Sequence, residues 1–404
     1  MKYKNVKWNR LTRWLGMAGC YLAVVLVMAL GWTVQQLPDV IFVEKGQSLS
    51  FGQMPYVQVQ QKAGTQDVSR AVPTHSGNTQ LSLGGVLPLK TVRTVVTDRP
   101  VVRVCGTPFG IKMFSDGALV VAFSDIETPH GRANPAKAAG LRLGDWIVRV
   151  GSESVHSNKE LSAALQKVGG LAVEVTYQRD GVTGTTTMTP IQDEDDRWKA
   201  GMWVRDSSAG VGTLTFVDEN KGIFGGLGHP ISDSDTGESI ALRTGEIVPC
   251  TIVGHTKGKV GEPGELKGRF SSGLAIGTIR KNSACGIYGT VRQKFDGEYM
   301  PVAFCQEVHT GPAEILTTID GDTPARYAVD IERISYQASG DKHNLVLRVT
   351  DPTLLEATGG IVQGMSGSPI IQDGKLVGAV THVLVNDPTK GYGIFIENML
   401  NAAA

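Results

Sequence analysis

The sequence lacks an excess of charge of either sign. Lys plus Arg and Asp plus Glu both number 39, so the formal net charge is zero. This balance excludes the strong global field that favours nucleic acid or an acidic substrate. Any partner must therefore be recognised by a local site.

Aromatic residues are also scarce, at 6 %, and long amphipathic helical patterns are rare. Glycine is abundant instead, with 50 residues, as all-β domains require for many tight turns between short strands. The 404 residues, 41 % of them hydrophobic, suffice for two or three domains with their own cores. The expected fold class is mainly β.

The cysteines are few and poorly spaced for metal binding. One lies in an apolar run, and the remainder show no Cys-x-x-Cys spacing: Cys20, then Cys105, Cys250, Cys285 and Cys305. A zinc site is not indicated, and no motif for another metal or an organic cofactor is present. Because single cysteines in apolar strand-like contexts are usually packing residues, no disulfide is predicted.

The N-terminus predicts a membrane segment. Residues 1–13 form a basic flank with five cations: Lys2, Lys4, Lys7, Arg10 and Arg13. Residues 14–34 are uncharged and long enough to cross the ~30 Å hydrocarbon layer as a helix. Since a basic flank favours the cytoplasm, the chain after Gln35 is expected on the other side. A signal peptide cleaved near Ala29-Leu30-Gly31 is the alternative.

Two further regions precede the C-terminal half. Residues 35–100 are expected to form a polar stalk, rich in Gln, Ser and Gly, followed by short β-branched strands. Residues 101–190 carry helix signals: Asn134 as N-cap, Pro135 as first helical residue, Gly140 as C-terminal stop, and Lys159–Val168 with helical spacing. The acidic run 191–197 is expected to be a domain boundary.

Residues 101–190 resemble a PDZ domain, which has an α+β fold. The resemblance rests on the loop Pro108-Phe109-Gly110-Ile111, the block from Ala139 to Gly151, and the helix that follows. It implies binding of a peptide as an added edge strand, with N–H groups of Phe109, Gly110 and Ile111 around a terminal carboxylate. The ligand, in cis or in trans, is not specified. The alternative is that the glycines only form turns.

The region 198–404 contains many short β segments between Gly, Asp and Ser turns, which predicts a barrel or a pair of barrels. Its segment Gly364-Met365-Ser366-Gly367-Ser368-Pro369 resembles the nucleophile loop of chymotrypsin-like serine proteases. A glycine at 364 lets its N–H and that of Ser366 point at one developing oxyanion, which contributes about 3 kcal/mol per donor. Ser366 is therefore the predicted nucleophile.

A serine nucleophile needs a base. His229 is predicted for this role, because it ends the glycine-rich segment Phe224–Gly228 and precedes a stiffening proline. His255 is the second candidate, and His382 is expected on a strand near the cleft. Asp351 is the predicted orienting acid, with four competitors: Asp320, Asp322, Asp330 and Asp341.

Taken together, these features resemble the stage IV sporulation protein B peptidase family of endospore-forming bacteria. The resemblance includes Trp203–Phe216, Gly228-His229-Pro230-Ile231 and the Ser366 loop, and spans nearly the full chain. It implies a Ser366, His229 and Asp351 protease, anchored between the forespore and mother-cell membranes. Such an enzyme cuts itself and then the regulator of a membrane metalloprotease complex, which releases a late sigma factor.

Met365 distinguishes the loop from zymogen-activated enzymes, which carry an Asp there that pairs with a new N-terminus. Regulation must therefore use another route, and the PDZ module is expected to present the stalk for cleavage between about Glu44 and Lys90.

Two alternative functions remain. An envelope quality-control protease of the high-temperature-requirement type has the opposite domain order, and a non-catalytic PDZ scaffold leaves the Ser366 loop unexplained.

Overall fold

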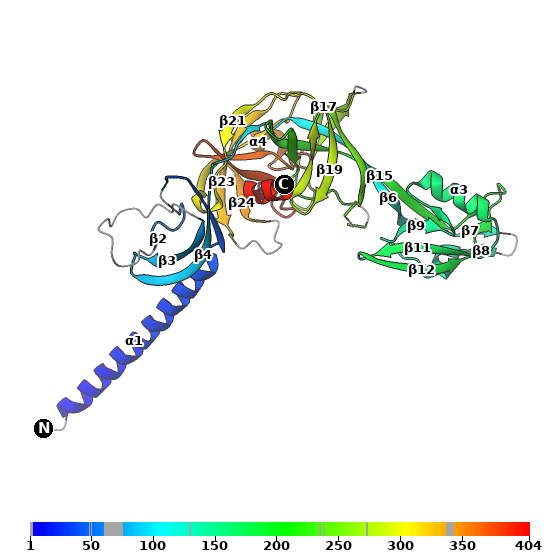
Figure 1. Cartoon of the computed structure of the whole chain (residues 1–404). Coiled ribbons are helices and arrows are strands. Elements are labelled where there is room, and N and C mark those ends of the chain that lie inside the picture. The colour runs from blue at the N-terminus through cyan, green and yellow to red at the C-terminus, as the bar shows by residue number, and fades with distance from the viewer. Residues whose placement is uncertain are drawn as a thin grey trace.

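The computed structural model describes residues 3–47, 49, 51–59, 76–128, 131–233, 236–237, 239–271, 274–336 and 343–404. A long N-terminal helix, α1 (Tyr3–Gln36), projects from a body of β-strands, and a small domain extends from the opposite side (Figure 1). The prediction of a mainly β chain with an N-terminal apolar helix, a PDZ domain and a barrel-type protease domain is confirmed.

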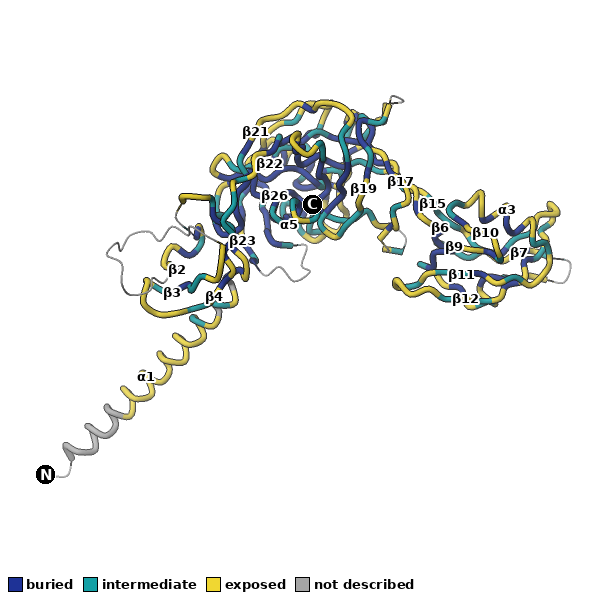
Figure 2. Tube along the Cα trace, in the orientation of Figure 1, coloured by how far each residue is buried: buried dark blue, intermediate teal, exposed yellow. Residues whose placement is uncertain are grey.

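Helix α1 is apolar and exposed along the part whose side chains are described. Residues Arg13–Gln35 are long and apolar enough to cross a membrane, and none of this segment's most apolar window is buried against the protein. Trp14 and Leu22 are 69 % and 72 % exposed. Most of the described part of α1 is exposed (Figure 2). Large apolar side chains are rarely left together in water, so the helix has the surface of a membrane segment.

The region expected to be a polar stalk is more ordered than predicted. Its described part forms a four-stranded sheet in the order β1-β4-β3-β2: β1 (Val40–Glu44), β2 (Val57–Val59), β3 (Gly77–Leu83) and β4 (Leu87–Thr97). Ile41, Leu81 and Val92 are almost fully buried in a core shared with the C-terminal barrel. The polar composition hid this sheet because only one of its faces is apolar.

The C-terminal barrel is closed and has six strands in the order β22-β23-β24-β27-β26-β25. They are β22 (Gly311–Thr317), β23 (Ala325–Ile334), β24 (Leu345–Val349), β25 (Pro369–Gln372), β26 (Lys375–Val383) and β27 (Lys390–Phe395). Asp373 and Gly374 both have positive φ and form the tight turn of the β25–β26 hairpin.

A second ring of strands lies beside this barrel. It runs β6-β17-β19-β20-β16-β15, and pairing of β15 with β6 closes it. The members are β6 (Pro108–Phe123), β15 (Met202–Asp218), β16 (Ile223–Gly226), β17 (Leu242–Thr256), β19 (Gly277–Ser283) and β20 (Gly286–Val291). Strands β5 (Val101–Val104), β18 (Glu265–Phe270) and β21 (Glu298–Pro301) extend the sheet. The closed barrel and this ring form the pair of barrels that the sequence predicted.

Strands β6 and β15 continue out of the ring and enter the PDZ domain (Figure 1). Its other elements are β7 (Ile126–Thr128), β8 (Gly131–Ala133), α2 (Pro135–Ala138), β9 (Trp146–Val150), β10 (Glu153–Ser154), α3 (Asn158–Val168), β11 (Val173–Arg179), β12 (Val182–Met188), β13 (Ile191–Gln192) and β14 (Trp198–Lys199). Asn134 caps α2 through its side chain, as predicted.

The predicted start of the PDZ domain at residue 101 is wrong. Pro108 to Ser115 pair with β15 and β17 and so form part of the second ring, called the peptidase ring below because it belongs to the predicted peptidase domain. Val101–Val104 pair with β15 and β21 and extend the sheet of the same ring. Short β-branched runs look the same in either domain, because strand patterns do not specify the neighbour with which a strand pairs.

Helix α5 (Ile396–Ala403) closes the C-terminus against both barrels, and Ile396 and Met399 are fully buried there. Its Glu397 accepts the Cys305 N–H within the short helix η1 (Cys305–Glu307). Burial raises the pKa of Glu397 to about 7, although this hydrogen bond opposes the rise. Because the folded pKa exceeds the ordinary value, folding binds a proton between these two values.

We therefore expect Glu397 to lower stability as the pH rises from about 4.5 to 7, by about 1–3 kcal/mol. Glu397→Gln should remove this dependence and unfold at higher urea concentration than wild type at pH 8. Urea unfolding of both proteins at pH 5 and pH 8 measures it. Equal pH slopes in the two proteins would contradict the assignment.

Candidate active site

The Ser366 loop connects helix α4 (Pro352–Thr358) to β25 of the C-terminal barrel. Gly364 and Gly367 both adopt left-handed backbone conformations, with φ of 96° and 97°. Between them, Met365 is fully buried in the barrel core, whereas Ser366 is half-buried. Since only glycine adopts such conformations without strain, the two glycines let the loop turn sharply on each side of the serine.

Strand β15 holds this loop through three hydrogen bonds. The Thr213 N–H donates to the Ser366 carbonyl at 2.9 Å, and its hydroxyl donates to the Gly364 carbonyl at 2.9 Å. The Thr215 hydroxyl donates to the Gly367 carbonyl at 2.7 Å. Within the described residues, the Gly364 and Ser366 N–H groups make no backbone hydrogen bond. The loop thus keeps two donors available for an oxyanion.

Thr213 and Thr215 were not singled out as site residues from the sequence. Their only signal is the alternation of hydroxyl side chains along Gly212–Phe216, a segment that the family resemblance already included. Both are buried, at 2 % and 0 % exposure. A buried hydroxyl needs a hydrogen-bond partner, and here the partners are carbonyl oxygens of the Ser366 loop.

We expect Thr213→Val to lower kcat by about 10- to 100-fold with a smaller change in KM, because the loop loses a hydrogen bond that orients its donors. Thr215→Val is expected to act in the same direction. Steady-state kinetics on a peptide substrate measures both. Thr213→Ser, which keeps the hydroxyl, is the matched control and should recover most of the activity; equal losses in Thr213→Val and Thr213→Ser would contradict the role.

His229 follows β16 through a strained turn. Leu227 and Gly228 both have positive φ, of 67° and 70°, and Leu227 is one of few non-glycine residues with this conformation. Its buried side chain lies over Gly212 of β15. The turn places the His229 Nδ1 2.7 Å from the Pro230 carbonyl oxygen. Because a carbonyl only accepts, Nδ1 carries the proton and Nε2 is the basic nitrogen.

Ser366 and His229 line the same groove, which has a volume of about 410 Å³ and lies between the two barrels. Its walls are mainly apolar: Ile111, Val211, Leu227, Ile231, Pro263, Ile361, Val362, Val383 and Val385. In the present conformation the Ser366 hydroxyl donates to the Thr381 carbonyl at 2.6 Å. In its predicted role as nucleophile, Ser366 would exchange this hydrogen bond for one to a general base, and catalytic hydrogen bonds commonly tighten only with substrate bound.

His382 is the second imidazole in this groove. Its ring centroid lies 4.6 Å from that of His229, and the His343 ring lies edge-on to it with the centroids 5.5 Å apart. His343 in turn stacks on Tyr392 at 3.9 Å. The expectation that His382 lies on a strand near the cleft agrees with this geometry. His255 lies on β17 opposite Leu266 and does not line the groove.

The structure does not bring Asp351 to this groove. Its carboxylate caps α4, accepting from the Thr353 and Leu354 N–H groups at 2.9 and 3.1 Å, and it also accepts the Ala328 N–H. Among the residues that the structure describes, no carboxylate lines the groove, so the competitors Asp320, Asp322 and Asp330 are also absent from it. Asp341 lies outside the described residues. The Thr-Asp-Pro pattern has the form of a helix N-cap before proline at N1.

The two possible roles of Asp351 predict different effects of Asp351→Asn. Asparagine caps helices as well as aspartate does, so a capping role predicts activity within a few-fold of wild type. A catalytic acid replaced by asparagine costs about 10⁴-fold in kcat. We expect the first result, together with a loss of about 1 kcal/mol of stability in Asp351→Ala. Kinetics and urea unfolding of both variants measure this, and a 10⁴-fold loss in Asp351→Asn at unchanged stability would restore the catalytic assignment.

The predicted PDZ loop also lies elsewhere. Phe109, Gly110 and Ile111 are buried in the peptidase ring, between β15 and β17. A side chain at position 110 would meet the Phe270 ring at 2.6 Å. These residues therefore cannot surround a peptide carboxylate. Gly110 permits close packing of strands, and Ile111 lines the Ser366 groove.

No cluster of three or more His, Cys, Asp or Glu side chains within the described part of the chain is arranged to hold a metal ion.

The five cysteines, all in described residues, form no disulfide. Burial raises the pKa of the Cys105 thiol to about 12 and that of Cys250 to about 11. These two thiols have the environment of packing residues rather than nucleophiles.

Comparison with protein families agrees with this arrangement. A PDZ domain model matches residues 117–189, which excludes the Phe109 loop and agrees with the boundary seen in the structure. No curated protein matches the chain. The model for the SpoIVB peptidase S55 matches residues 196–400, slightly more than half of the sequence. The chain therefore belongs to the SpoIVB peptidase S55 family and is a serine endopeptidase.

Proposed function

We propose that this peptidase is anchored in a membrane by α1, acts on the extracytoplasmic side, and uses Ser366 as nucleophile and His229 as general base. The observation that carries the catalytic part is the single groove that contains both side chains beside two N–H donors. The Pro230 carbonyl fixes the His229 tautomer, a task that a carboxylate performs in other serine proteases.

The proposed reaction has two steps. His229 Nε2 takes the Ser366 proton as the oxygen attacks the substrate carbonyl, while the Gly364 and Ser366 N–H groups bind the developing oxyanion. The proton then passes to the leaving amine, and water repeats the sequence on the acyl-enzyme. The apolar groove walls favour an extended substrate with apolar side chains on either side of the cleaved bond.

The proposed physiological reaction is cleavage of the chain itself, followed by cleavage of a regulator of a membrane metalloprotease complex that processes a late sigma factor during sporulation. Support comes from membership of the family, the PDZ domain and the apolar helix preceded by basic residues. The proposed self-cleavage region, between about Glu44 and Lys90, includes residues 60–75, which lie outside the described part of the structure.

Self-cleavage is tested by expressing wild type and Ser366→Ala in a membrane-containing host and determining the mature N-termini by mass spectrometry. The wild type should shorten within this region, while the variant stays full length. If both proteins remain intact or shorten alike, self-cleavage by Ser366 is wrong. Mixing tagged Ser366→Ala with untagged wild type then shows whether one copy cuts another.

A further inference from the structure

The four-stranded N-terminal sheet joins two parts of the chain that the proposed self-cleavage would separate. In the order β1-β4-β3-β2, strands β3 and β4 lie in the middle, and β1 and β2 form the two edges. The connection from β2 to β3 contains residues 60–75, which belong to the proposed self-cleavage region. A cut there leaves α1, β1 and β2 on the N-terminal fragment, and β3, β4 and all later elements on the catalytic fragment.

The N-terminal fragment pairs with the β3–β4 hairpin at both of its edges. Strand β1 pairs in parallel with β4 along Val40–Glu44, and β2 pairs antiparallel with β3 along Val57–Val59. Because neither pairing involves residues 60–75, a cut in that connection leaves both pairings intact. Two strands on opposite edges must separate together before the fragment can leave, so dissociation is expected to be slow.

Apolar side chains of the N-terminal fragment also contribute to the core of the C-terminal barrel. Five of them are at most 5 % exposed and lie in the same core cluster as Val329 and Leu347 of the barrel strands: Leu37, Ile41, Phe51, Met54 and Val57. Dissociation would expose these five side chains and the apolar surface beneath them to water. The hydrophobic effect opposes this exposure roughly in proportion to the apolar area.

Arg99 of the catalytic fragment forms an ion pair with the N-terminal fragment. Its Nε donates to the Glu44 carboxylate at 2.9 Å, and its two terminal nitrogens donate to the Glu307 carboxylate, each at 2.9 Å. The Arg99 side chain is only 9 % exposed, and its guanidinium lies over the Phe304 ring. Because the arginine is largely shielded from solvent, its pair with Glu44 is screened less than a surface ion pair and adds to the attachment.

Close contacts with helix η1 hold the chain at β1 and after it. The Gly52 N–H donates to the Gln306 carbonyl at 2.8 Å, and a Cβ atom at position 52 would lie only 2.3 Å from the Glu307 carbonyl oxygen. The buried side-chain amide of Gln306 donates to the Phe42 carbonyl. The Phe42 ring stacks on that of Phe304, with the centroids 5.9 Å apart. The N-terminal fragment therefore contacts η1 as well as the hairpin.

We propose that the N-terminal fragment stays bound after a cut between β2 and β3, so that self-cleavage converts the peptidase into a stable two-fragment complex. The inference rests on the proposed self-cleavage, but the contacts that carry it do not involve Ser366. With α1 as the membrane anchor, the cut peptidase remains at the membrane. Its release requires a further cut on the N-terminal side of Leu37, or unfolding of the sheet.

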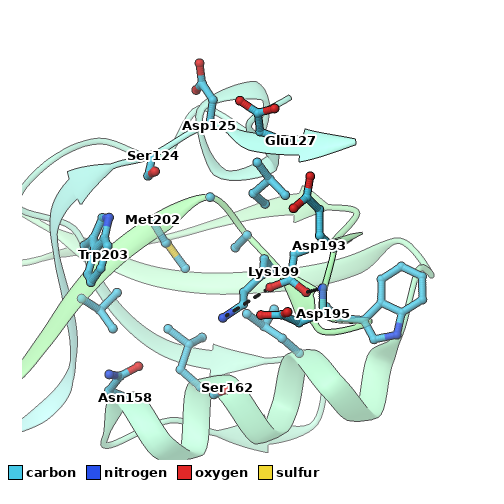
Figure 3. Close-up of a pocket in the computed structure, with 18 residues that line it drawn as sticks. Ser124, Asp125, Glu127, Asn158, Ser162, Asp193, Asp195, Lys199, Met202 and Trp203 are labelled. Atoms are coloured by element: carbon cyan, nitrogen blue, oxygen red, sulfur yellow. Dashed lines mark hydrogen bonds and ion pairs between the residues drawn. The ribbon is translucent and has the colours of Figure 1, made fainter. Parts of the chain in front are cut away.

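The PDZ domain does not hold this fragment in the described part of the structure. Its groove between α3 and the start of β15 is lined by residues from Ser124 to Val204, and none of them belongs to the N-terminal fragment (Figure 3). Among the described strands, none of β1 to β4 pairs with a strand of the PDZ domain. Attachment of the fragment is therefore expected to be independent of that domain.

The test replaces self-cleavage by an added cleavage site. Full-length Ser366→Ala protein carries an affinity tag before Met1 and the sequence Glu-Asn-Leu-Tyr-Phe-Gln-Gly between Gly64 and Thr65, and is cut in detergent by the protease specific for that sequence. On the affinity resin, the tagged fragment should retain nearly all of the catalytic fragment. If most of it passes through the resin after complete cleavage, the proposal is wrong. Because the variant lacks Ser366, this result is separate from that of the self-cleavage experiment.

Ile41→Asp tests whether the sheet is the surface responsible. Ile41 is fully buried in β1, and a carboxylate there should increase the released share of the catalytic fragment by at least about 10-fold. Val40→Asp is the matched control, since Val40 is exposed on the same strand, and its release should equal that of the parent. Equal retention in both variants would overturn the assignment to the sheet. Where circular dichroism shows the uncut Ile41→Asp protein to be unfolded, Ile41→Ala takes its place.

Discussion

Replacing Ser366 or His229 by alanine should lower kcat by about 10⁴- to 10⁶-fold, and the double variant should be no slower than either single one. The reason is that the two side chains act as one unit: the base has no function without the hydroxyl, and the hydroxyl is a poor nucleophile without the base. Both line one groove, and the Pro230 carbonyl fixes the tautomer with a basic Nε2.

Steady-state kinetics on a peptide that the wild type cleaves gives kcat for the two single variants and the double variant. His255→Ala is the control, because His255 lies outside the groove. The control should retain wild-type activity. Additive losses in the double variant would mean that Ser366 and His229 act independently, and an unaffected His229→Ala would transfer the base role to another residue, of which His382 is the nearest.

Gly367→Ala should unfold the C-terminal barrel or cost more than about 4 kcal/mol of stability. A Cβ atom at this position would lie 1.9 Å from the Thr213 carbonyl oxygen and 2.6 Å from the Leu227 nitrogen. Both are backbone atoms of the neighbouring ring, which cannot move without separating the two barrels that form the active site. The left-handed φ adds a further cost of about 1–2 kcal/mol.

Gly374→Ala is the matched control for this prediction. Gly374 also has positive φ, at 71°, but a Cβ there would meet nothing within 4 Å. Its loss of stability should therefore be only about 1–2 kcal/mol, the cost of the backbone conformation alone. Urea unfolding of both variants separates the cost of the steric clash at position 367 from the cost of the backbone conformation. Similar losses at both positions would show that the close approach at Gly367 is relaxed easily.

The sequence predicted those features that depend only on residues within one short segment. The apolar N-terminal run, the Asn134 cap of α2 and the Gly-rich loop around Ser366 each depend on residues close in sequence, so their patterns predicted them. Residue type and order predicted Ser366 and His229 as a pair, and the structure places both in one groove.

The sequence did not predict which distant segments pair or contact one another in the folded chain. The Phe109 loop has the pattern of a peptide-binding turn, but tertiary pairing with β15 and β17 buries it. Asp351 is of the residue type expected for a triad acid, but its carboxylate accepts hydrogen bonds from N–H groups at the N-terminus of α4. In both cases the same residues fit two structures, and the contacts made by the rest of the chain select one.

By itself, the sequence determined the mainly β composition, the membrane-type helix, and the residue types of a serine peptidase with a PDZ domain. Only the tertiary structure decided that β15 runs from the PDZ domain into the second ring of strands and holds the Ser366 loop there through Thr213 and Thr215. The reason is physical: a strand's hydrophobic pattern specifies which face is buried, but its backbone can pair with any edge that the fold places beside it.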